Sequence, residues 1–278
     1  MIDAVKSTAK QWLTSKKVDM IFGLKEQNGD IVPYLFTKED ELDSLVLSTK
    51  HRISYVCRPS KRTIVYLMQE KEPNAKIGIV ARGCDERALI ELAKRGQIDI
   101  SKIEILGVPC AKSEAEDCLC DRPYPSNLVV GEKVEGISKN AAIESLLGKS
   151  LAERSEFWKH QLDKCIKCYG CRNVCPECFC QDCRMEQQLW AETGKLPSEF
   201  PMFHFIRFYH LADRCIGCGA CEKACPVDIP LLTIFKQLRK DIKDLFDYDP
   251  GIELGQESPL LATLDERPMK EEAAGVKV

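Results

Sequence analysis

Two cysteine runs in this chain share one spacing, C-x2-C-x2-C-x3-C-P, and they end at Pro176 and Pro226. Thiolates spaced in this way bind two 4Fe–4S clusters, and the fourth cysteine of each run reaches the cluster of the other run. The spacing therefore predicts two iron–sulfur sites that exchange their fourth ligands. Cluster one is expected to use Cys165, Cys168, Cys171 and Cys225, and cluster two is expected to use Cys215, Cys218, Cys221 and Cys175.

A disulfide framework and zinc sites are the alternatives to iron–sulfur ligation. Disulfide-rich chains are typically short and secreted, whereas this chain has 278 residues and starts without the apolar stretch of a signal peptide. Zinc uses C-x2-C pairs around one tetrahedral ion, so two fourfold runs that end in proline favour iron–sulfur clusters and leave zinc as the alternative. We therefore expect a reducing, cytoplasmic environment and clusters that tolerate oxygen poorly.

Four further cysteines lie at or after the ends of two expected strands. Cys84 follows the apolar run 77–81, and Cys110 ends the run that begins at residue 103. Because ligands gather at the carboxyl ends of strands in open α/β sheets, these thiols are expected to converge. A further metal site is predicted from four residues, with ordinary buried thiols as the alternative: Cys84, Cys110, Cys118 and Cys120.

Three more cysteines follow the first run within six residues, at Cys178, Cys180 and Cys183. Three thiols this close together are unusual for packing alone, so a metal role is favoured. The spacing does not name a fourth ligand. Cys57 is one candidate, and a site with three protein ligands and one open position is the other.

The first 150 residues show the alternation of strands and helices that is typical of an α/β domain. Asn28-Gly29 between two β-rich runs predicts a hairpin. The apolar runs that follow, separated by helical patterns, predict a small, mostly parallel sheet. Helices are expected at 4–16, 38–48, 60–71 and 85–96, and strands at 18–24, 31–36, 53–57, 77–81 and 103–108.

The remainder of the chain is expected to form an α+β two-cluster ferredoxin-like domain with flanking helices. The aromatic residues near 203–209 are expected to pack around the clusters, with a docking face as the alternative. Helices are expected at 184–193, 198–213 and 228–247, and the expected domains are 1–150, 151–250 and an extended tail at 251–278.

Composition excludes several classes of function. The net charge is −3 and aromatic residues make up 7% of the chain, so no nucleic-acid partner is indicated. No stretch approaches the roughly 18 apolar residues of a membrane span. The chain also lacks a dinucleotide fingerprint, a phosphate-binding loop and any triad or paired-carboxylate arrangement, so no catalytic residue is assigned.

Four motifs give the chain a family resemblance. It resembles the iron–sulfur β-subunit family of deazaflavin-linked hydrogenases and formate dehydrogenases, which also supplies electron-transfer subunits to heterodisulfide-reductase-like complexes. The resemblance implies an α/β domain fused to a two-cluster ferredoxin domain within a larger complex, and it supports the metal site at Cys84. Its motifs are Ala81-Arg-Gly-Cys84-Asp-Glu-Arg87, Gly107-Val-Pro-Cys110, Cys165-Ile-Lys-Cys-Tyr-Gly-Cys171 and Pro176-Glu-Cys-Phe-Cys-Gln-Asp-Cys183.

The function expected from these patterns is an electron-transfer subunit of a multi-subunit oxidoreductase. It would relay single electrons through 4Fe–4S clusters between a catalytic dehydrogenase or hydrogenase subunit and a flavin-bearing or disulfide-reductase-like subunit. The alternative is a flavin-containing subunit that itself reduces a deazaflavin or similar coenzyme. Members of the resembled family often bind FAD, but the sequence shows no flavin-contact motif.

Overall fold

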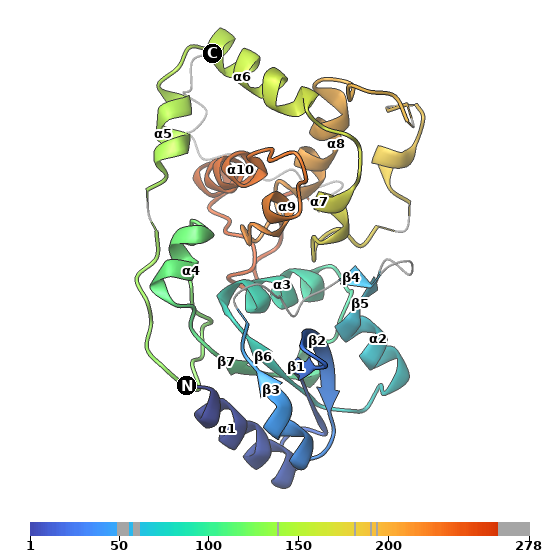
Figure 1. Ribbon diagram of the computed structural model, residues 1–278, viewed down its shortest axis with the longest axis vertical. Coiled ribbons are helices and arrows are strands. Elements are labelled where there is room, and N and C mark those ends of the chain that lie inside the picture. Colours follow the sequence, from blue (N-terminus) through green and yellow to red (C-terminus); the bar gives the residue numbers. More distant parts are fainter. Residues whose placement is uncertain are drawn as a thin grey trace. The chain divides into compact units, whose positions relative to one another are not determined.

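The computed structural model in Figure 1 shows a chain whose contacts cluster into two compact units. The N-terminal unit comprises Met1–Tyr55 and Arg62–Ser138, and the C-terminal unit comprises Val56–Lys61 and Lys139–Val278. The two units are described separately. The structure describes residues 1–48, 56–57, 62–137, 139–180, 182–189, 191–192 and 194–260, with the backbone alone at 56–57, 62–64 and 66–67.

A mixed sheet forms the centre of the N-terminal unit, with the strand order β2-β1-β6-β7 and β3 paired to β1. The expected hairpin is confirmed, because Asn28 and Gly29 both have positive φ and close the turn between antiparallel β1 and β2. The expectation of a mostly parallel sheet is wrong, because this hairpin joins the sheet. Among the described strands of this sheet, the parallel pairs are β1–β6 and β6–β7. The strands are β1 (Met20–Gln27), β2 (Asp30–Phe36), β3 (Leu45–Val46), β6 (Ile77–Ala81) and β7 (Ile103–Gly107).

Helices connect and flank these strands. The helix expected at 38–48 is wrong: a short 3-10 helix, η1, ends at Ser44, and the chain then extends into β3. Leu45 is fully buried beside β1, so strand pairing stabilises the extended form. The other elements of this region are α1 (Ile2–Thr14), η1 (Asp40–Ser44), β4 (Val56–Cys57), β5 (Arg62–Thr63), α2 (Ile64–Lys71), α3 (Gly83–Lys94), η2 (Ile100–Lys102) and α4 (Lys112–Asp117).

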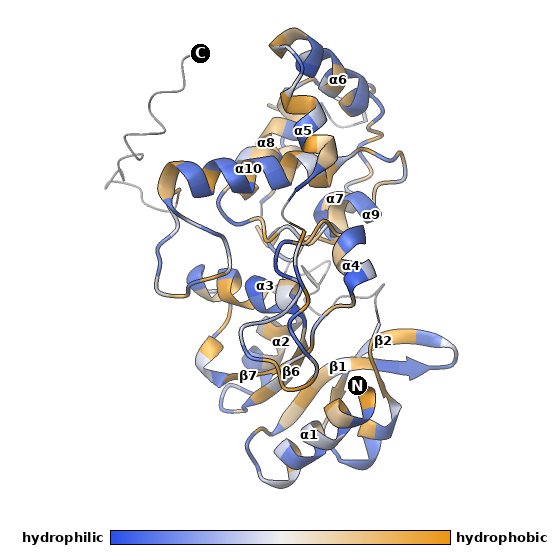
Figure 2. Ribbon diagram, turned by 90° about the vertical axis from the view of Figure 1, so that its left-hand side faces the viewer, coloured by the Kyte–Doolittle hydropathy of each residue, from blue (hydrophilic) through white to orange (hydrophobic). Residues whose placement is uncertain are grey.

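The core of the N-terminal unit follows the central strands. Ile21, Ile77 and Leu106 are completely buried, and Figure 2 shows the apolar character of β1 in orange. The sheet therefore has the apolar interior that the sequence runs indicate. It provides a rigid base for the cysteines that follow β6 and β7.

The end of β7 is packed against the backbone of the segment 123–129. Cys110 N donates to Pro123 O over 2.8 Å, and Val129 N donates to Gly107 O over 3.0 Å. A Cβ at Gly107 would lie 2.0 Å from the carbonyl oxygen of Asn127. This close approach of two backbones requires glycine, and it holds the chain that carries Cys110.

The substitution Gly107→Ala is expected to lower the free energy of unfolding by about 1–3 kcal/mol. The added methyl group would clash with backbone atoms of the neighbouring segment, and these atoms can move away only at a cost in free energy. Denaturant unfolding of the full chain measures this loss. Gly255→Ala is the matched control, because a Cβ there meets no atom within 4 Å. Equal stability of the two variants would contradict the packing described for Gly107.

The described residues between 139 and 260 form helices and loops, without an assigned strand, so the α+β class expected for this region is seen there only in its helices. The expected helix at 184–193 is wrong. The carbonyl of Met185 accepts a hydrogen bond from the Tyr169 hydroxyl over 3.2 Å, and the helix ends after one turn. The elements are α5 (Ala141–Leu147), α6 (Leu151–Asp163), α7 (Gly170–Asn173), η3 (Arg184–Glu186), α8 (Met202–Leu211), α9 (Ala220–Lys223) and α10 (Leu231–Phe246).

Helices α8 and α10 supply most of the core of the C-terminal unit. The rings of Phe208 and Phe235 pack edge to face with centroids 5.4 Å apart, and Figure 2 shows the alternating polar and apolar stripes of α10. The helix expected at 198–213 is shorter than predicted: the Ser198 hydroxyl donates to Leu162 O over 3.2 Å, and α8 starts after Pro201. Among the described residues, no helix is both long and apolar enough to span a membrane.

The first ten residues of the expected tail, 251–260, pack onto the C-terminal unit. Ser258 is buried and its hydroxyl donates to the Asp213 carboxylate. Gln256 Nε2 donates to Asp247 O over 2.8 Å. This part of the tail is therefore hydrogen-bonded to the helical region. Residues 261–278 lie outside the described part of the chain.

Candidate iron–sulfur centres

The two cysteine runs adopt the same unusual backbone at equivalent positions. In the first run Lys167 and Tyr169 have φ of 52° and 58°, and in the second run Gly217 and Gly219 have φ of 65° and 72°. Left-handed residues between cysteines turn the chain tightly, so successive side chains converge on one side of the loop. Each run then enters a short helix, α7 or α9, before its fourth cysteine. The sequence repeat is therefore also a structural repeat.

Backbone N–H groups point at the sulfur atoms of the first run. Lys167 N donates to Cys165 Sγ over 3.4 Å, and Gly170 N donates to Cys168 Sγ over 3.5 Å. Hydrogen bonds to sulfur raise the potential of a bound cluster. These loops therefore direct backbone N–H groups toward the sulfur atoms that would bind a cluster.

The fourth cysteine of the second run lies beside the first run. Burial raises the pKa of Cys165, and Cys171, Cys168 and Cys225 lie close enough to raise it further. Ile229 N donates to Cys225 Sγ over 3.4 Å. The structure thus brings together the four residues expected for cluster one. Their role as ligands stays a prediction.

A separate cavity gathers the four residues expected for cluster two, Cys175, Cys215, Cys218 and Cys221, and it contains about 360 Å³ of space free of atoms. Burial raises the pKa of Cys221, and Cys218 and Cys215 raise it further. Apolar side chains of α10, among them Phe235, line the same cavity. The fourth cysteine of the first run therefore faces the second set, as the exchanged pattern predicts.

The side chain of Arg207 on α8 lies between the two cysteine sets. It is 5% exposed, and Arg207 Nη2 donates to Cys171 O over 3.0 Å. Burial acts to lower the pKa of Arg207, but nearby thiols from both sets, Cys171, Cys221 and Cys175 among them, hold it well above its ordinary value. A permanent positive charge therefore faces both expected clusters from inside the core.

A second buried arginine lies beside cysteines of the N-terminal unit. Arg87 is 1% exposed, and Arg87 Nη2 donates to Cys120 Sγ over 3.7 Å. Burial raises the pKa of Cys110 to about 12, and Cys84 and Cys120 contribute to that rise. The structure therefore brings Cys84, Cys110 and Cys120 together. Cys118 is half-buried at the end of α4.

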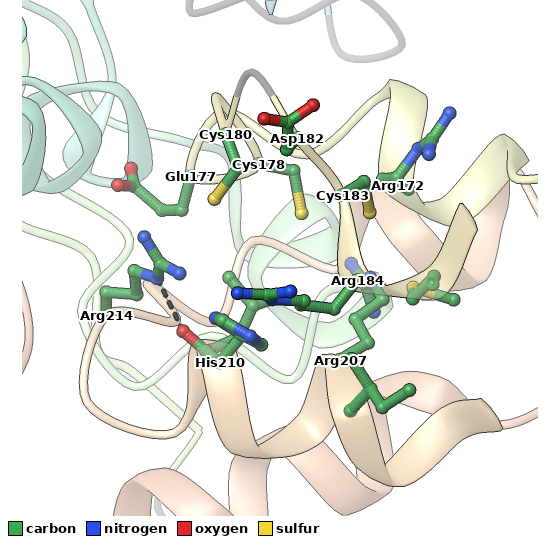
Figure 3. Close-up of a pocket in the computed structure, with 13 residues that line it drawn as sticks. Arg172, Glu177, Cys178, Cys180, Asp182, Cys183, Arg184, Arg207, His210 and Arg214 are labelled. Atoms are coloured by element: carbon green, nitrogen blue, oxygen red, sulfur yellow. Dashed lines mark hydrogen bonds between the residues drawn. The ribbon is translucent and has the colours of Figure 1, made fainter. Parts of the chain in front are cut away.

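The remaining cysteine group lines a third pocket, shown in Figure 3, which holds about 460 Å³ of space free of atoms. Cys178, Cys180 and Cys183 all contribute to its wall. The side chain of Cys57, the candidate fourth ligand, lies outside the described part of the structure. The other charged or polar residues of the pocket are Arg172, Glu177, Asp182, Arg184, Arg207, His210 and Arg214.

Among the described residues, no three or more His, Cys, Asp or Glu side chains are arranged to hold one metal ion. A zinc ion requires all its thiolates within about 2.3 Å of one centre, whereas each thiolate of a 4Fe–4S cluster binds a different iron atom.

The sequence motifs include Arg87 without assigning it a role, and they do not include Arg207. Arg207 lies four residues from both Phe203 and Leu211, which are buried on the same helix. A charged residue within an apolar helical stripe is the one sequence signal that indicates it. The aromatic residues near 203–209 are expected from the sequence to pack in the interior around the clusters. Phe203 is buried, whereas Phe205 is 53% exposed.

Comparison with known proteins adds the family context. Residues 208–230 match the 4Fe–4S binding domain family. The chain is 42% identical over 135 residues to the F420-dependent formate dehydrogenase subunit beta of Methanocaldococcus jannaschii, covering 48% of this chain and 35% of that protein. It is 41% identical over 134 residues to the F420-dependent formate dehydrogenase 1 subunit beta of Methanococcus maripaludis, covering 47% and 34%.

The chain therefore spans about a third of the length of these curated relatives. The matched stretch covers about half of this chain, and the 4Fe–4S binding domain family matches residues 208–230. The expected resemblance to the iron–sulfur β-subunit family of formate dehydrogenases is thus confirmed.

Proposed function

We propose that this protein is the iron–sulfur electron-transfer subunit of a multi-subunit oxidoreductase complex. It relays single electrons through two 4Fe–4S clusters. The observation that carries the proposal is the exchange of fourth cysteines between the runs: Cys225 lies beside Cys165 and Cys171, and Cys175 lines the cavity of the second set. This arrangement supports two neighbouring clusters, because electron transfer between clusters requires a short distance.

The side chains and backbone of the chain set the environment of each cluster. The clusters supply one-electron chemistry when bound, and their potentials depend on net charge, hydrogen bonds to sulfur and solvent exposure. Lys167 N and Gly170 N donate to sulfur, Phe235 limits access of water, and Arg207 provides positive charge. These groups tune the electron carriers without taking part in proton transfer.

The partners in this proposal follow from the relatives. Their names describe β-subunits of F420-dependent formate dehydrogenases, which supports a catalytic formate dehydrogenase or hydrogenase subunit as electron donor or acceptor. A flavin-bearing or disulfide-reductase-like subunit is proposed as the second partner. A cytoplasmic location and the domain limits 1–150, 151–250 and 251–278 belong to the same proposal.

The cysteines of the N-terminal unit are proposed as an additional metal site. Cys84, Cys110 and Cys120 lie together around the charge of Arg87, and a thiolate set needs such compensation when it is buried. Cys118 follows as the fourth proposed ligand, two residues from Cys120 in the chain. This site would extend the relay into the N-terminal unit.

Metal and flavin analysis of the anaerobically reconstituted full chain tests the proposed function. We expect at least about eight iron and eight sulfide ions per chain and a reduced-state EPR spectrum of two interacting clusters. Zinc in place of iron would overturn the proposal. Stoichiometric FAD would favour the alternative, a flavin-containing subunit that itself reduces a deazaflavin or similar coenzyme.

A further inference from the structure

We propose that Cys178, Cys180 and Cys183 bind a further iron–sulfur cluster through three thiolates, leaving one iron open to a ligand from outside the chain. This site is distinct from clusters one and two and goes beyond the two-cluster relay. It lies in the pocket of about 460 Å³ between the first cysteine run and α8.

The three sulfur atoms share one wall of the pocket. Figure 3 shows Cys178, Cys180 and Cys183 with their sulfur atoms directed into the space that Arg184, His210 and Arg214 border from the other side. All three are free thiols, and each is half-buried. The loop after Pro176 therefore presents three possible ligands to one cavity. No fourth cysteine lines this pocket in the part of the chain that the structure describes.

Arginines around the pocket supply the positive charge that a thiolate-bound cluster needs. Arg172 forms a side-chain hydrogen bond with Cys183, and Arg207 forms one with Cys178, beside which Arg214 also lies. Guanidinium groups keep their charge at all physiological pH values, and with Arg184 these four arginines outnumber the two carboxylates of the pocket, Glu177 and Asp182. Packing alone gives no reason to surround cysteines with arginines, because a buried structural cysteine behaves as a small apolar side chain.

The ligand set favours an iron–sulfur cluster over a zinc ion in this proposal. All three protein ligands are cysteines on one short loop, and cysteine thiolates are the ligands of iron–sulfur clusters. Arg184 and Arg214 line the same pocket, so an anionic outside ligand would meet positive charge there.

Cys178 also contacts the neighbouring site, which determines the choice of variant. It forms a hydrogen bond with Cys175, an expected ligand of cluster two. Replacing Cys178 would therefore disturb two sites at once. The double variant Cys180→Ser/Cys183→Ser removes two proposed ligands and leaves the contact between Cys178 and Cys175 in place.

The test compares the full chain with this double variant after anaerobic reconstitution. We expect the variant to lose about four iron ions per chain while the EPR signals of clusters one and two persist. Leu189→Ser is the control, because Leu189 is 83% exposed and does not line the pocket, and its iron content should equal that of the unchanged chain. Unchanged iron in the double variant, or loss of zinc in place of iron, would overturn the proposal.

A second measurement uses the unchanged chain and does not depend on the folding of a variant. Ferricyanide accepts one electron from a 4Fe–4S cluster with an open position, which releases that iron as Fe²⁺ and leaves a 3Fe–4S cluster. We expect the EPR signal of a three-iron cluster on mild oxidation of the unchanged chain and not of the double variant. Absence of this signal from the unchanged chain, or a disulfide among the three cysteines in thiol titration, would overturn the proposal. Neither result bears on clusters one and two.

Discussion

The substitution Cys225→Ser is expected to remove cluster one, although Cys225 belongs to the second cysteine run. The structure places Cys225 with Cys165 and Cys171, so the serine deprives the first site of its fourth thiolate. We expect the loss of about four iron ions per chain and of the EPR signal of one cluster. The second cluster keeps all four of its expected ligands and its signal.

The reciprocal substitution provides the matched control. Cys175→Ser should remove cluster two with the same loss of iron, because Cys175 lines the cavity of the second set. In iron content and EPR signals, Cys225→Ser should therefore resemble Cys168→Ser, and Cys175→Ser should resemble Cys218→Ser. If Cys225→Ser instead resembled Cys218→Ser, and Cys175→Ser resembled Cys168→Ser, the exchanged ligand assignment would be wrong.

Replacing Arg207 with glutamine is expected to lower the midpoint potentials of both clusters. The guanidinium of Arg207 is buried and close to thiols of both sets, so its charge stabilises the added electron of each reduced cluster. A unit charge at roughly 6–8 Å in an effective dielectric of about 20 contributes about 2–3 kcal/mol, which corresponds to a shift on the order of 100 mV for one electron. EPR-monitored redox titration of the reconstituted chain measures this shift.

The variant Arg207→Lys separates the effect of charge from that of packing. Lysine keeps the positive charge but loses the planar fork that donates to Cys171 O. We expect its potentials to lie near those of the unchanged chain, even if stability falls in both variants. Equal potentials for the glutamine variant and the unchanged chain, with both clusters bound, would show that Arg207 does not tune them.

The elements that the sequence predicted correctly are those with strong local signals. Asn28-Gly29 fixes the hairpin through its own backbone preference, and the runs at 77–81 and 103–108 pair because both are almost wholly apolar. The start of α10 also follows from a local cause, since Pro230 precedes the first helical residue. Such signals need no knowledge of distant contacts.

The incorrect predictions depend on contacts between distant residues. The helical pattern at 184–193 is broken because Met185 O bonds to Tyr169, which lies in the first cysteine run. The mixed character of the sheet depends on which strand β1 pairs with, and periodicity does not contain that information. For the candidate sites, spacing grouped the cysteines, but it could not identify Arg87 and Arg207 as their buried counter-charges, because arginine is usually exposed.

The two cysteine loops adopt the same backbone conformation, but the cost in conformational free energy differs between them. The second run uses Gly217 and Gly219 at its left-handed positions, whereas the first run uses Lys167 and Tyr169, which costs about 1–2 kcal/mol for each residue that is not glycine. Contacts with the segment between the runs compensate, because Lys167 Nζ pairs with Glu199 over 2.8 Å and Tyr169 bonds to Met185 O. The segment between Cys175 and Cys215 thus stabilises the first loop. Shortening this segment would remove these contacts and would not yield a minimal ferredoxin.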